Sequence, residues 1–111
     1  MKGFEKLKQN WEFRRAYSRG RSYITPDFVL YAVKGRQGKI RLGITVSRKI
    51  GTAVKRNRAK RVLTAAFRAC LPFLSDGTDY VLVARSRLLL RKSDGVARAL
   101  AATLEKAGEE E

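Results

Sequence analysis

Apolar residues recur at helical spacing in the middle of the chain. Between residues 54 and 71 they follow the i, i+3, i+4, i+7 pattern of one buried helical face, at Ala59, Val62, Leu63, Ala66, Phe67 and Cys70. At about 100° per residue, a stripe on the opposite side consists of Asn57, Arg61, Thr64 and Arg68. The pattern predicts an amphipathic helix. Gly51 and Thr52 suit a tight turn and an N-cap before it, and Pro72 marks its end.

The segment before this helix is predicted to form one short helix followed by three strands. Asn10 suits the N-cap of a helix that ends near Gly20 and carries Trp11, Phe13, Ala16 and Tyr17. β-Branched and aromatic residues, interrupted by turn residues, then predict strands at 21–25, 28–34 and 39–46. We expect these three strands to form an antiparallel meander.

After the amphipathic helix the pattern predicts one more strand and one more helix. Residues 79–84 are apolar on both faces, which is typical of a strand in the interior of a sheet. Ser93 suits the cap of a last helix with Val96, Leu100 and Leu104 in its buried stripe. The predicted fold is an α+β domain spanning residues 1–111, in the order αβββαβα, with a four-stranded sheet, three helices and an acidic tail from about 108 to 111.

Charge changes this picture of an ordinary small domain. The 111 residues carry 25 Lys and Arg against 10 Asp and Glu, a formal net charge of +15, and no acidic residue lies between Asp27 and Asp76. Six of the cations crowd onto the amphipathic helix, at Lys55, Arg56, Arg58, Lys60, Arg61 and Arg68. A one-signed surface of this kind predicts a polyanionic partner, with nucleic acid first. No apolar stretch approaches the roughly 18 residues of a membrane span, so we expect a cytoplasmic protein that binds no membrane.

The sequence offers little for catalysis by the protein itself. It contains no histidine and one cysteine, Cys70, which falls on the apolar face of the amphipathic helix. Asp76 and Asp79 lie in a predicted turn and at a strand start, where Asp most often serves the backbone as an Asx-turn or cap. Trp11 and Phe67 we interpret as structural. We expect no catalytic side chain and no metal bound tightly by the protein.

Two features favour RNA as the polyanion. The turn Arg48-Lys49-Ile50-Gly51-Thr52 leads into Lys55 and Arg56, and together they suit a phosphate cradle at a helix N-terminus. Phe13 and Tyr17 stand one helical turn apart, and with Tyr31 they suit a surface on which single-stranded bases stack. For each of the three rings, packing in the core remains the alternative interpretation.

The order of residues in the basic segment closely resembles the signature of the bacterial ribonuclease P protein subunit. The resemblance rests on Gly43, Val46-Ser47-Arg48-Lys49-Ile50-Gly51, Ala53-Val54, Arg56-Asn57-Arg58, Lys60-Arg61 and Ala66-Phe67-Arg68. Weaker agreement at Phe13, Gly20, Phe28–Tyr31 and Asp79–Arg85 extends it over nearly the whole chain.

This resemblance implies a fold, a partner and a set of site residues. The family's fold is like domain 2 of ribosomal protein S5, with an unusual left-handed βαβ crossover around the basic helix. Its members assist a catalytic RNA that uses Mg²⁺ to cleave the 5′ leader from precursor tRNA, without an obligate protein partner. The residues implied to contact the catalytic RNA are Arg48, Lys49, Lys55, Arg56, Asn57, Arg58, Lys60, Arg61 and Arg68. Those implied to hold the single-stranded leader are Phe13, Tyr17, Tyr31 and Arg85.

Two departures from the family pattern affect this transfer. Thr64-Ala65 stands where the family commonly has Arg-Glu, which shifts phosphate binding toward Arg68. Ser86 follows Arg85 where relatives are often basic, so leader affinity is expected to depend on Arg85 or Arg87.

Two other interpretations compete with this one. A structural RNA-binding protein like a ribosomal protein shares the size, charge and α+β composition, and fold alone does not separate the two. A helix-turn-helix DNA-binding protein needs a helix packed before Val54, where the pattern predicts strand and turn.

Overall fold

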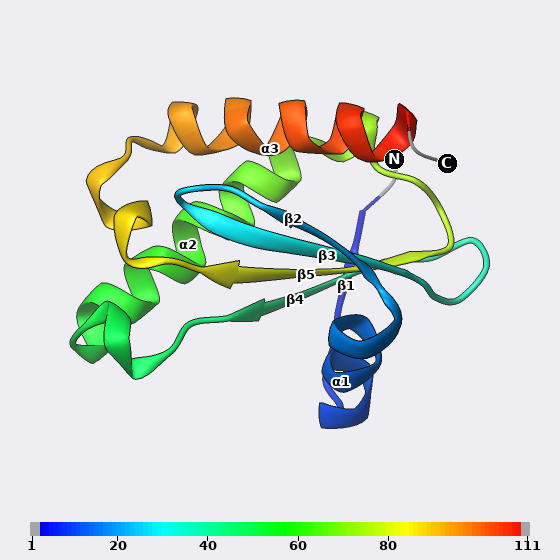
Figure 1. Ribbon diagram of the computed structural model, residues 1–111, viewed down its shortest axis with the longest axis horizontal. Coiled ribbons are helices and arrows are strands. Elements are labelled where there is room, and N and C mark those ends of the chain that lie inside the picture. The colour runs from blue at the N-terminus through cyan, green and yellow to red at the C-terminus, as the bar shows by residue number, and fades with distance from the viewer. Residues whose placement is uncertain (1–2, 110–111) are drawn as a thin grey trace.

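A five-stranded sheet forms the centre of the protein in the computed structural model (Figure 1), which describes residues 3–109 except for the side chains of Ser93 and Glu109. Across the sheet the strands follow the order β1 (Glu5–Lys6), β4 (Ile40–Thr45), β5 (Thr78–Ala84), β3 (Phe28–Lys34) and β2 (Arg21–Ile24). The pairs β1–β4 and β4–β5 are parallel, whereas β5–β3 and β3–β2 are antiparallel. The sheet is therefore mixed.

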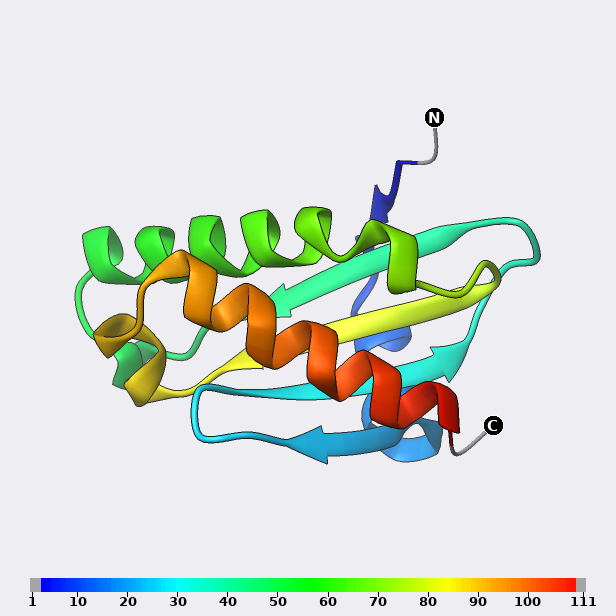
Figure 2. The same cartoon turned by 90° about the horizontal axis from the view of Figure 1, so that it is seen from above.

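Helices cover both faces of this sheet. The helix α1 (Asn10–Arg19) lies on one face, and α2 (Ala53–Ala69) and α3 (Ser93–Glu109) lie together on the other (Figures 1 and 2). Short 3-10 helices occupy Arg48–Ile50, Leu71–Phe73 and Ser86–Leu90. The predicted α+β class with three helices is confirmed.

The predicted sheet was wrong in two respects. It has five described strands, not four, because residues 5–6 pair with β4; two residues are too few to show a strand periodicity. The meander is also wrong, because β5 lies between β3 and β4. The predicted interior position of β5 is confirmed, and it explains the error: the strand with apolar residues on both faces takes the centre, where both faces are covered.

The start of α2 follows the sequence prediction, and the start of α1 differs by one residue. The Thr52 hydroxyl accepts a hydrogen bond from Lys55 N at 3.3 Å, and Gly51 before it has φ 135°, which an L side chain rarely adopts. In α1 the N-cap is Gln9 instead of Asn10, because Glu12 turns back and accepts the Gln9 N–H at 3.0 Å. The predicted cap side chain of Ser93 and residues 110–111 of the acidic tail lie outside the described part.

Two apolar clusters hold the layers together. The larger lies between the sheet and α2 with α3, and it includes Leu63 and Phe67, both fully buried. The smaller lies under α1 around Ala16 and Val81. The structural role predicted for Phe67 is thus confirmed, whereas Trp11 is 53% exposed and belongs to neither cluster. Over residues 3–109, no helix combines the length and the hydropathy that crossing a membrane requires.

Candidate RNA interface

The basic residues of α2 and of the turn before it form one exposed surface. With Ala59, Leu63 and Phe67 buried on the inner side, the polar side of α2 faces solvent. Its exposed residues, including those of the preceding turn, are Arg48, Lys49, Lys55, Asn57, Arg58, Lys60, Arg61 and Arg68, and Arg56 is half-buried. None of these cations forms an ion pair with another described residue. Their charges are therefore available to a polyanion.

A hollow beside this surface adds one cation that sequence reasoning missed. It is lined by Lys6, Lys60, Arg61, Thr64, Ala65, Arg68 and Ala69. Lys6 reaches it because β1 pairs with β4, a contact between distant segments that no local pattern signals. The Thr64 hydroxyl donates to Lys60 O at 2.7 Å, so it is satisfied within its own helix, while the Arg68 guanidinium lies 5.3 Å from the Phe4 ring centroid.

A second hollow lies between α1 and the end of β4, and we call it the α1 groove. It is lined by Asn10, Phe13, Arg14, Tyr17, Ile44, Thr45, Val46 and Lys60. The Tyr17 hydroxyl is 2.8 Å from Thr45 Oγ1, and its ring meets the Tyr31 ring edge to face, with centroids 4.9 Å apart. The structure thus brings Phe13, Tyr17 and Tyr31 together. Tyr17 is 40% exposed, which favours a ligand-facing ring over a core one.

Arg85 is not among the residues that line the α1 groove. It is exposed directly after β5, and its Nη1 donates to Thr25 O at 3.0 Å. Its backbone N–H donates to Asp27 O at 3.0 Å, which joins the end of β5 to the β2–β3 turn.

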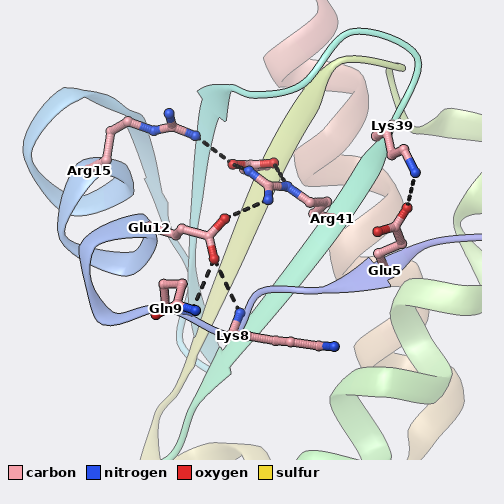
Figure 3. Close-up of polar contacts among 8 residues, drawn as sticks. Glu5, Lys8, Gln9, Glu12, Arg15, Lys39 and Arg41 are labelled. Atoms are coloured by element: carbon pink, nitrogen blue, oxygen red, sulfur yellow. Dashed lines mark hydrogen bonds and ion pairs between the residues drawn. The ribbon is translucent and has the colours of Figure 1, made fainter.

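A buried ion network joins α1 to the sheet (Figure 3), and the sequence prediction for Asp79 was wrong. Asp79 has 0% exposure and accepts two hydrogen bonds from Arg41, Nε at 2.8 Å and Nη2 at 2.7 Å, and one from Arg15 Nη2 at 2.7 Å. Arg41 Nη1 also meets Glu12 at 2.5 Å. Hydrogen bonding to Asp79 raises the pKa of Arg41, more than burial lowers it. The carboxylate thus serves distant side chains, not the local backbone.

A sequence signal for this network existed. Arg41 lies between the apolar residues Ile40 and Leu42 of a predicted strand, and Asp79 begins another one, so both occupy strand positions that face a covering element. Charged residues at such positions are rarely unpaired. The partners, however, are far apart in the chain.

Metal ligands are sparse in the structure. Among the described side chains of residues 3–108, no three His, Cys, Asp or Glu groups gather closely enough to hold a metal ion. Cys70 is buried, its thiol 3.5 Å from Ala97 O, and burial raises its pKa.

Comparisons with known proteins agree over nearly the whole chain. Residues 1–108 match the family model described as Ribonuclease P. The Ribonuclease P protein component of Clostridium beijerinckii is 37% identical over 110 residues, covering 93% of this chain and 88% of the relative, and that of a Clostridium botulinum strain is 40% identical, covering 93% and 94%.

Solved structures give the same result for the fold. A Staphylococcus aureus RNase P protein mutant with defective mRNA degradation activity superposes with a TM-score of 0.82 at 30% identity, covering 93% of this chain and 87% of the other. The RNase P protein from Thermotoga maritima superposes with a TM-score of 0.81 at 29% identity, covering 92% and 96%.

Proposed function

The chain belongs to the bacterial ribonuclease P protein family and is a protein component of the ribonuclease P holoenzyme. On this basis we propose that it binds two RNAs at adjoining surfaces. The exposed face of α2 with the turn at residues 48–52 contacts the catalytic RNA. The α1 groove holds the single-stranded 5′ leader of precursor tRNA. The observation that carries this proposal is the position of Lys60, which lines both the basic hollow beside α2 and the α1 groove.

The charges of α2 support the contact with catalytic RNA. Each phosphate that a Lys or Arg neutralises releases counterions, so a cluster of unpaired cations gives strong, salt-dependent affinity that needs no particular base sequence. The start of α2 adds backbone N–H groups that point outward from the first turn, beside Arg48 and Lys49. This surface suits the backbone of a folded RNA.

The aromatic residues of the α1 groove support the contact with the leader. Unpaired bases stack on exposed rings, and each such contact contributes about 1–3 kcal/mol. Phe13 and Tyr17 line the groove together with the cations Arg14 and Lys60, which suit the phosphates of a strand whose bases stack on the rings. Arg85 is proposed to contact the leader outside the groove.

We further propose that the RNA subunit carries out the hydrolysis with Mg²⁺ and that the protein acts by binding and positioning. The chain has no histidine to act as a general acid or base, which supports this division of roles. Neutralising phosphates where leader and catalytic RNA converge reduces the repulsion that Mg²⁺ otherwise screens. The protein should therefore lower the Mg²⁺ requirement and favour precursor over mature tRNA.

We also infer that the single domain has the S5-domain-2-like fold with a left-handed crossover. Two observations support it. The strands β4 and β5 are adjacent and parallel, and in Figure 2, which views the sheet from the side of α2 with both strands pointing left, β4 lies above β5. The usual crossover is right-handed, so an experimental structure that traces β4, α2 and β5 with the opposite hand would overturn this inference.

Cleavage of precursor tRNA by a bacterial ribonuclease P RNA at low Mg²⁺, with and without this protein, tests the function. We expect cleavage to require the protein, and charge reversal at Arg61 to weaken binding of the catalytic RNA. Phe13→Ala and Tyr17→Ala should reduce affinity for precursor tRNA but not for mature tRNA. Absence of stimulation, together with tight binding to another structured RNA, would instead support a structural RNA-binding protein.

A further inference from the structure

Trp11 is a large aromatic side chain that the fold leaves outside both cores. It is 53% exposed on α1, although tryptophan is among the more buried residues on average. At about 100° per residue, Trp11 lies on the solvent side of α1, away from the fully buried Ala16. Arg14 lies between Trp11 and the side of α1 that faces the α1 groove. The indole therefore continues the groove onto the outside of the helix.

Arg15 holds the indole in place. Its guanidinium carbon lies 5.3 Å from the Trp11 ring centroid, within the range of a cation–π contact. The same guanidinium donates to Asp79 Oδ2 at 2.7 Å, and Asp79 is fully buried. Because Arg15 is anchored to the sheet (Figure 3), the ring beneath it loses little freedom when a ligand stacks on its open surface.

The charge around Trp11 indicates which class of ligand it suits. Lys8 and Arg14, each three residues from Trp11, are exposed, and neither forms an ion pair with another described residue. The only acidic residue of α1, Glu12, is buried and paired with Arg41. An open aromatic ring among unpaired cations is the arrangement that binds single-stranded nucleic acid.

We propose that Trp11 is a second stacking platform, which takes a leader base upstream of those in the α1 groove while Arg14 contacts the phosphate between the two places. This inference rests on the proposed function of the groove. The ten residues of α1 are about 15 Å long, and a stacked strand advances about 3.4 Å per nucleotide. A leader that follows the groove along α1 and continues to Trp11 therefore spans about four or five nucleotides.

Leader length provides the test. Affinity of the holoenzyme for precursor tRNA is measured with leaders of about two and about ten nucleotides, chosen to fall short of and to exceed that reach. Trp11→Ala should weaken binding of the long-leader substrate by about 5- to 100-fold and leave the short-leader substrate unchanged. Trp11→Phe should restore most of the affinity. Phe73→Ala, which removes an aromatic ring of similar exposure in the 3-10 helix after α2, is the matched control and should change neither.

Fluorescence gives a second, independent measurement, because Trp11 is the only tryptophan in the chain. A long leader should quench its emission in the holoenzyme, and a short one should not. If Trp11→Ala binds the long-leader substrate with wild-type affinity, the proposed platform is refuted. An equal loss of affinity for both substrates would refute it as well. Quenching by the catalytic RNA before substrate is added would assign Trp11 to that RNA and overturn its assignment to the leader.

The same set of variants tests the Trp11 platform and the proposed leader site in the α1 groove separately. Phe13→Ala and Tyr17→Ala should weaken binding of the long-leader substrate whatever the role of Trp11. If these variants lose leader affinity and Trp11→Ala does not, Trp11 is not a stacking platform, and the proposed leader site in the α1 groove is retained. If none of the three loses affinity, the proposed leader site itself fails.

Discussion

Replacing Asp79 with asparagine distinguishes a buried ion network from a local backbone cap. Asparagine is as good as aspartate in Asx-turns and caps, so a capping Asp79 would tolerate the change. In the structure, however, the carboxylate accepts three N–H groups, two from Arg41 and one from Arg15. An amide removes the negative charge and turns an NH₂ group toward these donors.

The size of the effect follows from burial. The Arg41 side chain is 11% exposed, and without Asp79 it keeps only Glu12 as a counter-charge. Removing one partner of a buried ion pair costs about 3–5 kcal/mol, because the other charge is left uncompensated. The lost ion pair with Arg15 contributes less to this cost, because the Arg15 side chain is 30% exposed and water screens its charge. At about 4–8 °C per kcal/mol, we expect Asp79→Asn to lower Tm by more than about 10 °C.

Thermal unfolding followed by far-UV circular dichroism measures this shift. Glu5→Gln is the matched control: it neutralises a carboxylate at the same 2.7 Å distance from a cation, Lys39, but on the exposed surface, so Tm should change little. A Tm for Asp79→Asn within about 2 °C of the wild type, well short of the shift expected for a buried ion pair, would refute the reasoning and restore the capping role.

Three further changes test other parts of the molecule. A Cβ added at Gly43 would lie 2.5 Å from the Phe13 ring, so Gly43→Ala should displace that ring and reduce the preference for precursor over mature tRNA about 5-fold; an unchanged ratio of the two Kd values would contradict this. Arg61→Ala should reduce the slope of log K against log salt for catalytic RNA by about 0.7–0.9, whereas the exposed Arg98→Ala on α3 should leave the slope as it is. The Cys70 thiol should resist iodoacetamide until the protein unfolds. Because burial raises its pKa above the ordinary 9.0, Cys70 should also make stability fall as pH rises past that value, and rapid labelling of the native protein would argue against both expectations.

Most of the local structure could be predicted from the sequence, because it depends on neighbouring residues. The two faces of α2 follow from the spacing of Ala59, Leu63 and Phe67 against that of Arg61 and Arg68, and the structure has both faces as expected. The interior position of β5 followed in the same way from its run of apolar residues. Family membership followed from an ordered series of residues within this same local segment.

Tertiary structure alone decided which segments meet. The insertion of β5 between β3 and β4 is a choice among strand pairings, and side-chain alternation is the same in all of them. The partners of Asp79 lie 38 and 64 residues away, beyond the reach of any periodicity. The exposure of Trp11 was missed because tryptophan is buried on average, whereas Ala16 and Phe13 fill the space between α1 and the sheet. Local spacing defines the faces of an element, and long-range packing determines which face is buried and which remains open to solvent.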